Sequence, residues 1–323
     1  MTMFPLSEDL QRLTNHIRMC GELACLLEVS ATPKPGNVHR FRDFAEIRYE
    51  DFLASSVAFG IFLEQLALQG FLLKDQQIDW SSLNLGQTIK AAIIQSNFFH
   101  QRSNTNLGII LLLSPLSVAA GMTISSDSLK CDISDLRKNV ELVMHHTTVN
   151  DAIEVSKGIA LANPGGLGKV KKYDVHANDL AKQLQDDNIS FLKLMEQCSE
   201  RDNICLELSR NYPITFNTGL AKLKDTLIIS KDINLAIINA YLDILASYPD
   251  SLIQRKFGIA FAQEISIRAR SILNLGGSLT IDGRRELEEF DIELQEDEKI
   301  NPGTSADIVA ATVFGYLLEG GKI

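Results

Sequence analysis

The residues from Glu28 to Arg40 include several side chains that could bind a nucleotide. Pro33 and Pro35 flank Lys34 and end the helical pattern before them, and each proline restricts the residue that precedes it. Donors suited to phosphate follow this stiff lysine closely: Asn37, His39 and Arg40. We interpret the segment as a phosphate-facing loop, because ordered loops often carry function. A plain surface turn of the same composition is the alternative.

Glu28 stands directly before this loop, beside the apolar stripe of the preceding helical pattern. A half-buried carboxylate in that place could act as a general base or as a metal ligand. A solvated charge at the end of a helix is the alternative, and the spacing alone slightly favours it.

A second group of polar residues precedes an apolar helical pattern. Asn104, Thr105 and Asn106 come before Gly108, and any of these side chains could cap the helix that follows. A helix N-terminus also binds phosphate, because its N–H groups and its dipole both favour an anion. The two interpretations are compatible, since a capping residue can lie beside a bound anion.

Two more aspartates lie near helix starts. Asp250 begins a pattern that carries Arg255, and Asp307 follows Thr304 at the spacing of a capping box, with Ser305 between them. Capping roles are favoured for both aspartates, because such positions prefer acidic residues. Carboxylates from separate helices could also meet inside a bundle and hold magnesium, and Arg255 could bind phosphate through its planar fork.

Helical periodicity runs through nearly the whole chain and must position these side chains. Apolar residues recur at spacings of three and four, first at Leu10, Leu13, Ile17, Cys20, Ala24 and Leu27, with Ser7 as a cap. Further helices are expected at about residues 52–70, 88–100, 106–120, 133–143, 149–162, 177–198, 202–211, 233–247, 251–274 and 305–318. Residues 226–230 are the best, though weak, strand candidate. The pattern predicts an all-α, bundle-like protein with residues 1–323 in a single domain.

Composition excludes several classes of partner. The net charge is −10, with 22% charged and 45% hydrophobic residues, so non-specific nucleic-acid binding and attraction to an anionic membrane are not expected. No secretory signal pattern opens the sequence, and the apolar stretch at 107–120 is shorter than a membrane span. The five cysteines form no C-x-x-C pair, which predicts reduced core residues in a cytoplasmic protein.

Taken together, these segments resemble the triphosphoribosyl-dephospho-CoA synthase family, whose members serve citrate lyase and malonate decarboxylase. The matching segments are residues 28–38, 104–108, 165–168 with 173–175, 250 with 255–258, and 301–307. They occur in the family's order and span most of the chain. Five segments in order are more specific than any one of them.

The resemblance implies an all-helical fold and a reaction between ATP and 3′-dephospho-CoA. In that reaction the 2′-hydroxyl of the acceptor attacks C1′ of the ATP ribose and adenine departs, with Mg²⁺ and cationic contacts on the triphosphate. By analogy with glycosidases, a carboxylate activates the hydroxyl and an acid assists the departing base. The implied catalytic or metal-binding residues are Glu28, Asp250 and Asp307, and the implied substrate-binding residues are Lys34, Asn37, His39, Asn104, Asn106, Arg255 and Ser305.

The sequence departs from the family pattern after Gly36, where the Gly-Ala-His element of the citrate-lyase members is missing. The expected acceptor is therefore 3′-dephospho-CoA or a related hydroxyl compound. Two other functions are compatible with the same residues: a magnesium-dependent nucleotide phosphohydrolase, and a non-catalytic nucleotide- or CoA-binding protein. The apolar stripes are compatible with a homodimer and equally with a monomer.

Overall fold

The computed structural model describes residues 7–100, 105–165, 168, 170, 172–296 and 300–323, and within them it contains helices and no β-strand. This confirms the all-α prediction. The α-helices are α1 (Glu8–Ser30), α2 (Tyr49–Lys74), α3 (Leu85–Ser96), α4 (Leu107–Thr123), α5 (Ile133–His145), α6 (Val149–Ala162), α7 (Leu180–Asp186), α8 (Phe191–Cys198), α9 (Asn203–Ser209), α10 (Leu220–Ser230), α11 (Ile233–Ser247), α12 (Ser251–Phe257), α13 (Ile259–Asn274), α14 (Ile281–Gln295) and α15 (Gly303–Leu318). Two 3₁₀ turns, Trp80–Ser82 and Gly277–Leu279, and a π-helical segment, Ile214–Gly219, lie between them.

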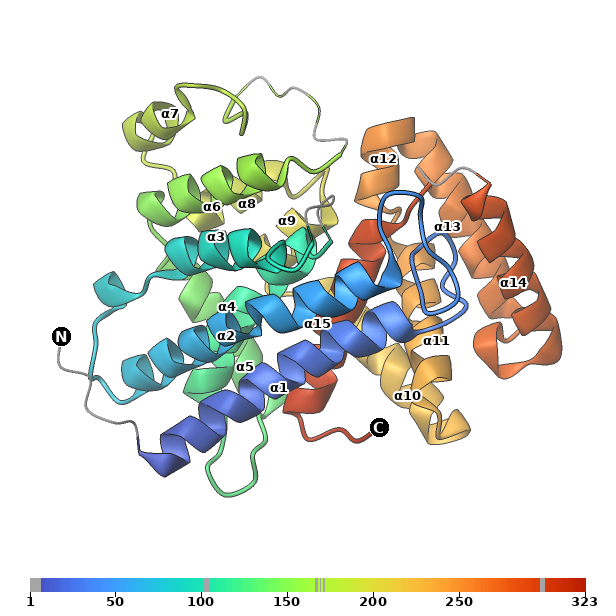
Figure 1. Cartoon of the computed structure of the whole chain (residues 1–323), viewed down its shortest axis with the longest axis horizontal. Helices are drawn as coiled ribbons and strands as arrows, with labels where there is room; N and C mark the ends of the chain where they lie inside the picture. The colour runs from blue at the N-terminus through green and yellow to red at the C-terminus, as the bar shows by residue number, and fades with distance from the viewer. Residues whose placement is uncertain (1–6, 101–104, 166–167, 169, 171, 297–299) are drawn as a thin grey trace.

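Four helices form the centre of the molecule. α1 and α2 lie side by side in opposite directions, and α4 and α15 pack behind them (Figure 1). Nearly every residue of α4 and α15 is buried, as their apolar sequences require. Ser7 caps α1, since its hydroxyl accepts a hydrogen bond from the backbone N–H of Leu10 at 3.2 Å.

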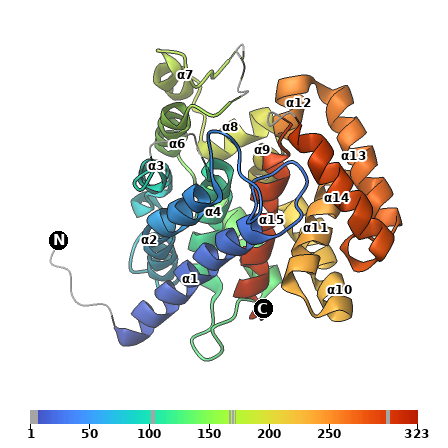
Figure 2. The same ribbon diagram turned by 45° about the vertical axis from the view of Figure 1, so that its right-hand side comes forward.

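The remaining helices form two flanks around this centre. α3, α6 and α7 lie on one side, and α10, α11, α13 and α14 lie on the other (Figure 2). α12 lies at the end of the second flank that is near α9 (Figures 1 and 2). The two flanks therefore face each other across the ends of the central helices.

Two predicted long helices are broken in the structure. The pattern at 177–198 is divided into α7 and α8 by a turn at Asn188, whose φ is 50°, and Ser190 caps the second helix. The pattern at 251–274 is divided at Gly258, whose φ of 92° suits glycine best. Both breaks re-aim the chain without interrupting the apolar spacing, so periodicity alone did not reveal them.

The strand candidate at 226–230 was wrong, because these residues end α10. Helix α14 was missed, because charged residues dominate its sequence. Its buried residues Leu287, Phe290 and Leu294 nevertheless keep a helical spacing that could have revealed it.

Helix α2 is long and apolar enough to span a membrane by length and composition, the one such helix in the described part of the chain. In the structure, 56% of its apolar window is buried, and it packs against α1, α3 and α4. These contacts are those of a core helix.

The prediction that all cysteines are reduced was wrong for one pair. Cys198 and Cys205 form a disulfide that links the end of α8 to α9. Cys20, Cys25 and Cys131 are free and buried, as expected, and burial raises the pKa of the Cys20 and Cys131 thiols to about 12.

Candidate active site

A cavity of about 940 Å³ opens where the two flanks face each other. Its wall includes the end of α1, the loop after it, the starts of α4 and α15, and parts of α6, α8, α9 and α12. The volume is typical of a site for a nucleotide-sized ligand. All five matching sequence segments contribute residues to its described lining, and the segment at 104–108 does so through Thr105, Leu107 and Gly108.

Helix N-termini give the cavity an electropositive character. α4 and α15, the two long central helices, both begin at its wall, at Leu107 and Gly303. The first N–H groups of any helix have no partner within that helix, and the dipole adds a partial positive charge. This end of the cavity is therefore suited to an anion.

Cationic side chains exceed acidic ones among the described lining residues. The cations are Lys34, Lys172, Arg201, Arg255 and Lys256, and the acids are Glu28, Asp202 and Asp307. An acidic protein thus presents a locally cationic cavity, which favours a polyanionic ligand.

Glu28 and Lys34 form a buried ion pair in the cavity wall. Lys34 is 1% exposed, and its Nζ also donates to the backbone carbonyl of Glu28 at 2.9 Å. Burial raises the pKa of the Glu28 carboxyl, and the Lys34 ammonium opposes that shift. The pair brings two predicted site residues together, but each largely neutralises the charge of the other.

The loop after α1 is fixed by contacts on its outer side. Asn37 donates to the hydroxyl of Tyr241 at 2.9 Å, and that hydroxyl donates to the carbonyl of Pro35 at 2.7 Å. His39 lies 3.1 Å from Asp291 of α14, which also accepts from the N–H of Gly36 at 3.2 Å. Asn37 reaches the cavity, whereas His39 is buried in the support of the loop and does not line it.

Asn106 is also turned away from the cavity. It is 1% exposed, and its side-chain amide donates to the hydroxyl of Ser55 at 2.9 Å, which ties the start of α4 to α2. Asn104 lies outside the described residues.

Asp250 and Ser305 join two helix starts. One oxygen of Asp250 accepts from the N–H groups of Leu252 and Ile253 at 2.9 and 3.1 Å, which caps α12. The other oxygen accepts from the N–H and hydroxyl of Ser305 at 2.7 and 2.8 Å. Burial raises the pKa of Asp250, and these hydrogen bonds oppose the rise. Neither residue lines the cavity, so the capping interpretation describes Asp250 in this structure.

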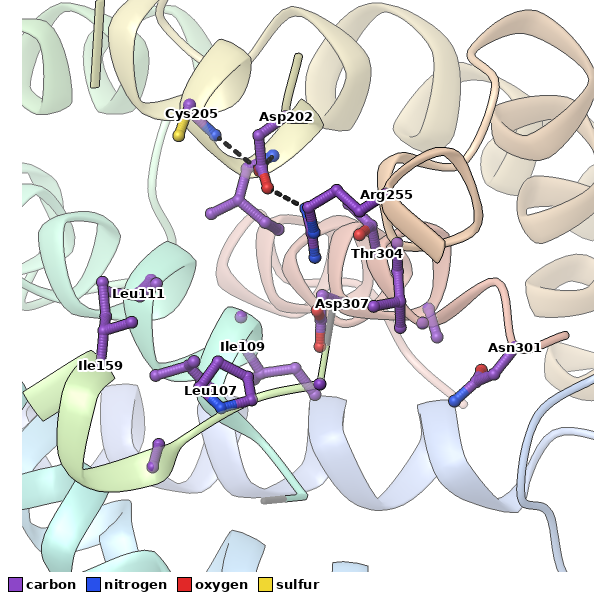
Figure 3. Close-up of a pocket in the computed structure, with 18 of the residues that line it drawn as sticks. Leu107, Ile109, Leu111, Ile159, Asp202, Cys205, Arg255, Asn301, Thr304 and Asp307 are labelled. Atoms are coloured by element: carbon purple, nitrogen blue, oxygen red, sulfur yellow. Dashed lines mark hydrogen bonds and ion pairs between the residues drawn. The ribbon is translucent and has the colours of Figure 1, made fainter. Parts of the chain in front are cut away.

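Asp307, like Glu28, is a predicted carboxylate that lines the cavity. It lies on α15 between Arg255 and Leu107 (Figure 3), and a side chain at Gly108 would overlap its carboxylate. Burial raises the pKa of Asp307 well above its ordinary value, and the charges of Glu28, Asp250 and Asp202 raise it further, while Arg255 lowers it. A carboxylate with a raised pKa is a stronger base than an ordinary one.

Arg255 lies beside Asp307 and forms an ion pair with Asp202 (Figure 3).

Four buried polar atoms in the cavity wall have no hydrogen-bond partner among the described residues: Nε of Arg255, Oδ1 of Asn301, Oγ1 of Thr105 and Oγ of Ser156. Buried polar groups are normally paired. Water or the polar groups of a bound ligand could supply these partners.

The three carboxylates predicted to bind magnesium do not form a metal-binding group. Among the described residues, no three His, Cys, Asp or Glu side chains gather closely enough to hold a metal ion. Asp250 is saturated by hydrogen bonds, and Glu28 is paired with Lys34. The residues fit at most a metal ion that arrives on a triphosphate and needs one or two protein carboxylates, with Asp307 as the available ligand.

Sequence reasoning missed Asp202, Ser156 and Asp291 as site or supporting residues. Asp202 begins a short helix much as Asp250 does, so the similarity of those two starts was a usable signal. No local sequence pattern distinguishes Ser156. It belongs to the candidate site because it is buried in the cavity wall.

Comparisons with known proteins show which family this chain resembles. Residues 14–323 match the profile of the CitG family, described as ATP:dephospho-CoA triphosphoribosyl transferase. A 2-(5''-triphosphoribosyl)-3'-dephosphocoenzyme-A synthase from Klebsiella pneumoniae is 22% identical over 309 residues, which cover 94% of this chain and 90% of that protein.

Shorter matches have higher identity. The "Probable 2-(5''-triphosphoribosyl)-3'-dephosphocoenzyme-A synthase" of Pseudomonas fluorescens Pf-5 is 30% identical over 115 residues, which cover 36% of this chain. The protein of the same name from Azotobacter vinelandii is 31% identical over 113 residues, or 35% of this chain. These matches span 39% and 38% of the two relatives' lengths.

A solved structure titled "Crystal structure of putative triphosphoribosyl-dephospho-coA synthase from Archaeoglobus fulgidus" has a similar fold. Its TM-score is 0.59 at 21% identity, with 84% of this chain and all of that one covered. Because the family profile matches nearly the whole length, the chain belongs to the CitG family.

Proposed function

We propose that this protein transfers the triphosphoribosyl part of ATP to the 2′-hydroxyl of 3′-dephospho-CoA, or of a related acceptor, and releases adenine. The observation that carries the proposal is Asp307, a partly buried carboxylate with a raised pKa that faces a cationic cavity beside Arg255 and two long-helix N-termini. The family match supports it, since that family is described by this reaction.

Asp307 would serve as the general base. Its carboxylate would take the proton of the acceptor hydroxyl while the oxygen bonds to C1′ of the ATP ribose and the bond from C1′ to adenine breaks. The departing adenine needs one proton, and the hydroxyl supplies one, so the reaction balances without another reactant. Because the pKa of Asp307 is raised, its carboxylate is a stronger base than that of an ordinary aspartate, and the proton that it takes can pass to the departing adenine.

The phosphates would occupy the cationic end of the cavity. Arg255 and the positive dipole ends of α4 and α15 are suited to bind them. Asn37, Asn301 and Thr304 line the same region and could orient ribose hydroxyls. The Glu28–Lys34 pair would provide a polar, nearly neutral wall, and the Glu28 charge helps to raise the pKa of Asp307.

Magnesium belongs to the proposal as the ion that accompanies ATP, since a triphosphate usually binds with Mg²⁺ and few protein ligands. Because Asp307 would serve as the general base, the triphosphate and water would hold this ion without that carboxylate. A cytoplasmic location and a homodimer stay predictions, and the dimer can be checked by light scattering of the purified protein.

The test is mass spectrometry of the purified protein with ATP and magnesium, with and without 3′-dephospho-CoA. Adenine and a triphosphoribosyl adduct that form only with the acceptor would establish the proposed reaction. Release of adenine without that acceptor would support cleavage of the bond between C1′ and adenine, and it would indicate that the acceptor is another compound. Release of phosphate alone would favour the phosphohydrolase, and binding without turnover would favour the non-catalytic protein.

A further inference from the structure

Asp202 uses its two carboxylate oxygens for different purposes. Oδ1 accepts from the backbone N–H groups of Ile204 and Cys205 at 2.8 and 3.3 Å, which caps α9. Oδ2 forms an ion pair with Nη1 of Arg255 on α12. One side chain therefore connects α9 to α12 beside the cavity (Figure 3).

This pairing determines which edge of Arg255 is available. A guanidinium has five N–H donors in a rigid plane, and Asp202 engages Nη1. Nε is buried and has no partner among the described residues, and the side chain lines the cavity next to Asp307. The Nε–Nη2 edge is the edge whose spacing matches two oxygens of one phosphate group.

We propose that Asp202 is a positioning residue that holds Arg255 with its Nε–Nη2 edge toward a phosphate of the bound nucleotide. The inference deepens the proposed function and rests on it, because the anion is taken to be the triphosphate of ATP. Asp202 itself touches no substrate. It acts by removing the rotational freedom of a long side chain before the ligand arrives, which lowers the entropic cost of binding.

The competing explanation is that Asp202 is only a helix cap. Other caps in this protein show what that role requires: Asp132 caps α5 by accepting from the N–H of Asp135 at 3.0 Å, on the exposed surface and away from the cavity. Asparagine caps helices about as well as aspartate. A pure cap therefore tolerates Asp→Asn, whereas a partner of Arg255 does not.

The experiment compares Asp202→Asn with Asp132→Asn as the matched control. Titration calorimetry measures the Kd of ATP with magnesium in the absence of any acceptor, and thermal unfolding checks the fold. We expect D202N to raise the Kd about 10- to 100-fold, the loss typical of a charge-assisted contact. D132N should bind as the wild type does, and both variants should unfold near the wild-type temperature. Wild-type affinity in D202N would overturn the proposal.

A double-mutant cycle shows whether Asp202 acts through Arg255. If it does, Asp202→Asn combined with Arg255→Gln should bind ATP no more weakly than Arg255→Gln alone. Additive losses would refute the proposal. If D202N does not fold, Asp202→Ser keeps a capping oxygen without the carboxylate and replaces it in the cycle.

Kinetics and binding also separate this inference from the proposed function. D202N should raise the KM for ATP and leave the KM for the acceptor unchanged, which a general loss of structure would not do. If the wild type binds ATP but releases no adenine, the proposed reaction fails, and the calorimetric cycle still decides the role of Asp202. If the wild type does not bind ATP, both fail.

Discussion

Three aspartates at or near helix starts have similar sequence surroundings and different environments. Both carboxylate oxygens of Asp250 accept hydrogen bonds from the starts of two helices. One oxygen of Asp202 caps α9, and the other forms an ion pair with Arg255. Asp307 lies one turn inside α15 and faces the cavity. Short-range spacing predicted a capping role for both Asp250 and Asp307. Their environments differ because of the packing of α4, α12 and α15, which local spacing does not reveal.

Asp307→Asn tests the general base. We expect adenine release to fall about 100- to 10,000-fold with unchanged helical circular dichroism, because the amide cannot accept the proton. In the wild type, kcat/KM should rise with pH through a range above the ordinary aspartate pKa of about 4, since the pKa of Asp307 is raised. If kcat/KM instead rises around the ordinary aspartate pKa, or if D307N keeps its activity, another group is the base.

The same shift has an opposite consequence for stability. The unfolded chain releases the Asp307 proton at its ordinary pKa, whereas the folded chain holds that proton to a higher pH. The free energy of unfolding therefore decreases as the pH rises from the pKa in the unfolded chain to the pKa in the folded chain. D307N should escape this loss and be more stable than the wild type at alkaline pH. Urea unfolding at acidic and alkaline pH measures the difference, and equal pH dependence in the two proteins would contradict it.

Asp250→Ala tests the capping role. It should lower the free energy of unfolding by about 3 kcal/mol, because buried N–H groups at the starts of α12 and α15 lose their acceptor. The control, Asp132→Ala, removes a single exposed cap and should cost about 1 kcal/mol. A folded, fully stable D250A protein without activity would instead support the catalytic role that the family resemblance implies.

At the level of elements, the close packing of α4 on α15 positions the candidate base. Gly108 has no side chain, and any Cβ there would overlap the carboxylate of Asp307. Gly36, with a φ of 74°, has a similar part in the loop after α1, where a Cβ would lie 2.8 Å from the carbonyl of Ile300. Two glycines of the matching segments thus explain how distant parts of the chain approach one another.

Gly108→Ala should therefore displace Asp307 and reduce adenine release by at least tenfold, while α4 keeps or gains helical stability. Gly315→Ala is the control, because it changes α15 away from the site, where the nearest atom to a new Cβ is the Phe216 ring at 3.3 Å. Steady-state assays of both variants, with thermal unfolding, give the comparison. Equal activity in G108A and wild type would mean that adenine release does not depend on the placement of the Asp307 carboxylate against Gly108.

Most helices were predictable, because burial imposes a regular spacing on apolar residues, as in α1 and α11. The breaks at Asn188 and Gly258 and the polar helix α14 were not, since each depends on which neighbours surround it. Of the residues expected from the sequence to form a site, those that line the cavity are Glu28, Lys34, Asn37, Arg255 and Asp307. His39, Asn106, Asp250 and Ser305 lie in its support, and local spacing does not tell a lining residue from a supporting one.

At the level of the whole molecule, the cavity lies where the two flanks face each other, and both α6 and α12 contribute to its lining. A ligand that binds both sides should stabilise the folded state. ATP with magnesium at 100 times its Kd should add about 2.7 kcal/mol, which corresponds to a rise of several degrees in Tm. Differential scanning fluorimetry over a range of ATP concentrations measures it, with Arg255→Gln as the variant that should show a smaller rise. No concentration dependence in the wild type would contradict nucleotide binding here.

The central position of α15 also bears on how the protein is made. This helix is the last one described in the chain, yet it packs against α1, α4, α11 and α12 and carries Asp307. While a ribosome is still producing the preceding segments, the apolar surfaces that will surround α15 have nothing to cover them. The nascent chain should therefore need protection from aggregation until about residue 318 has emerged. Folding to the native state and acquisition of the candidate base should then occur in the same late step.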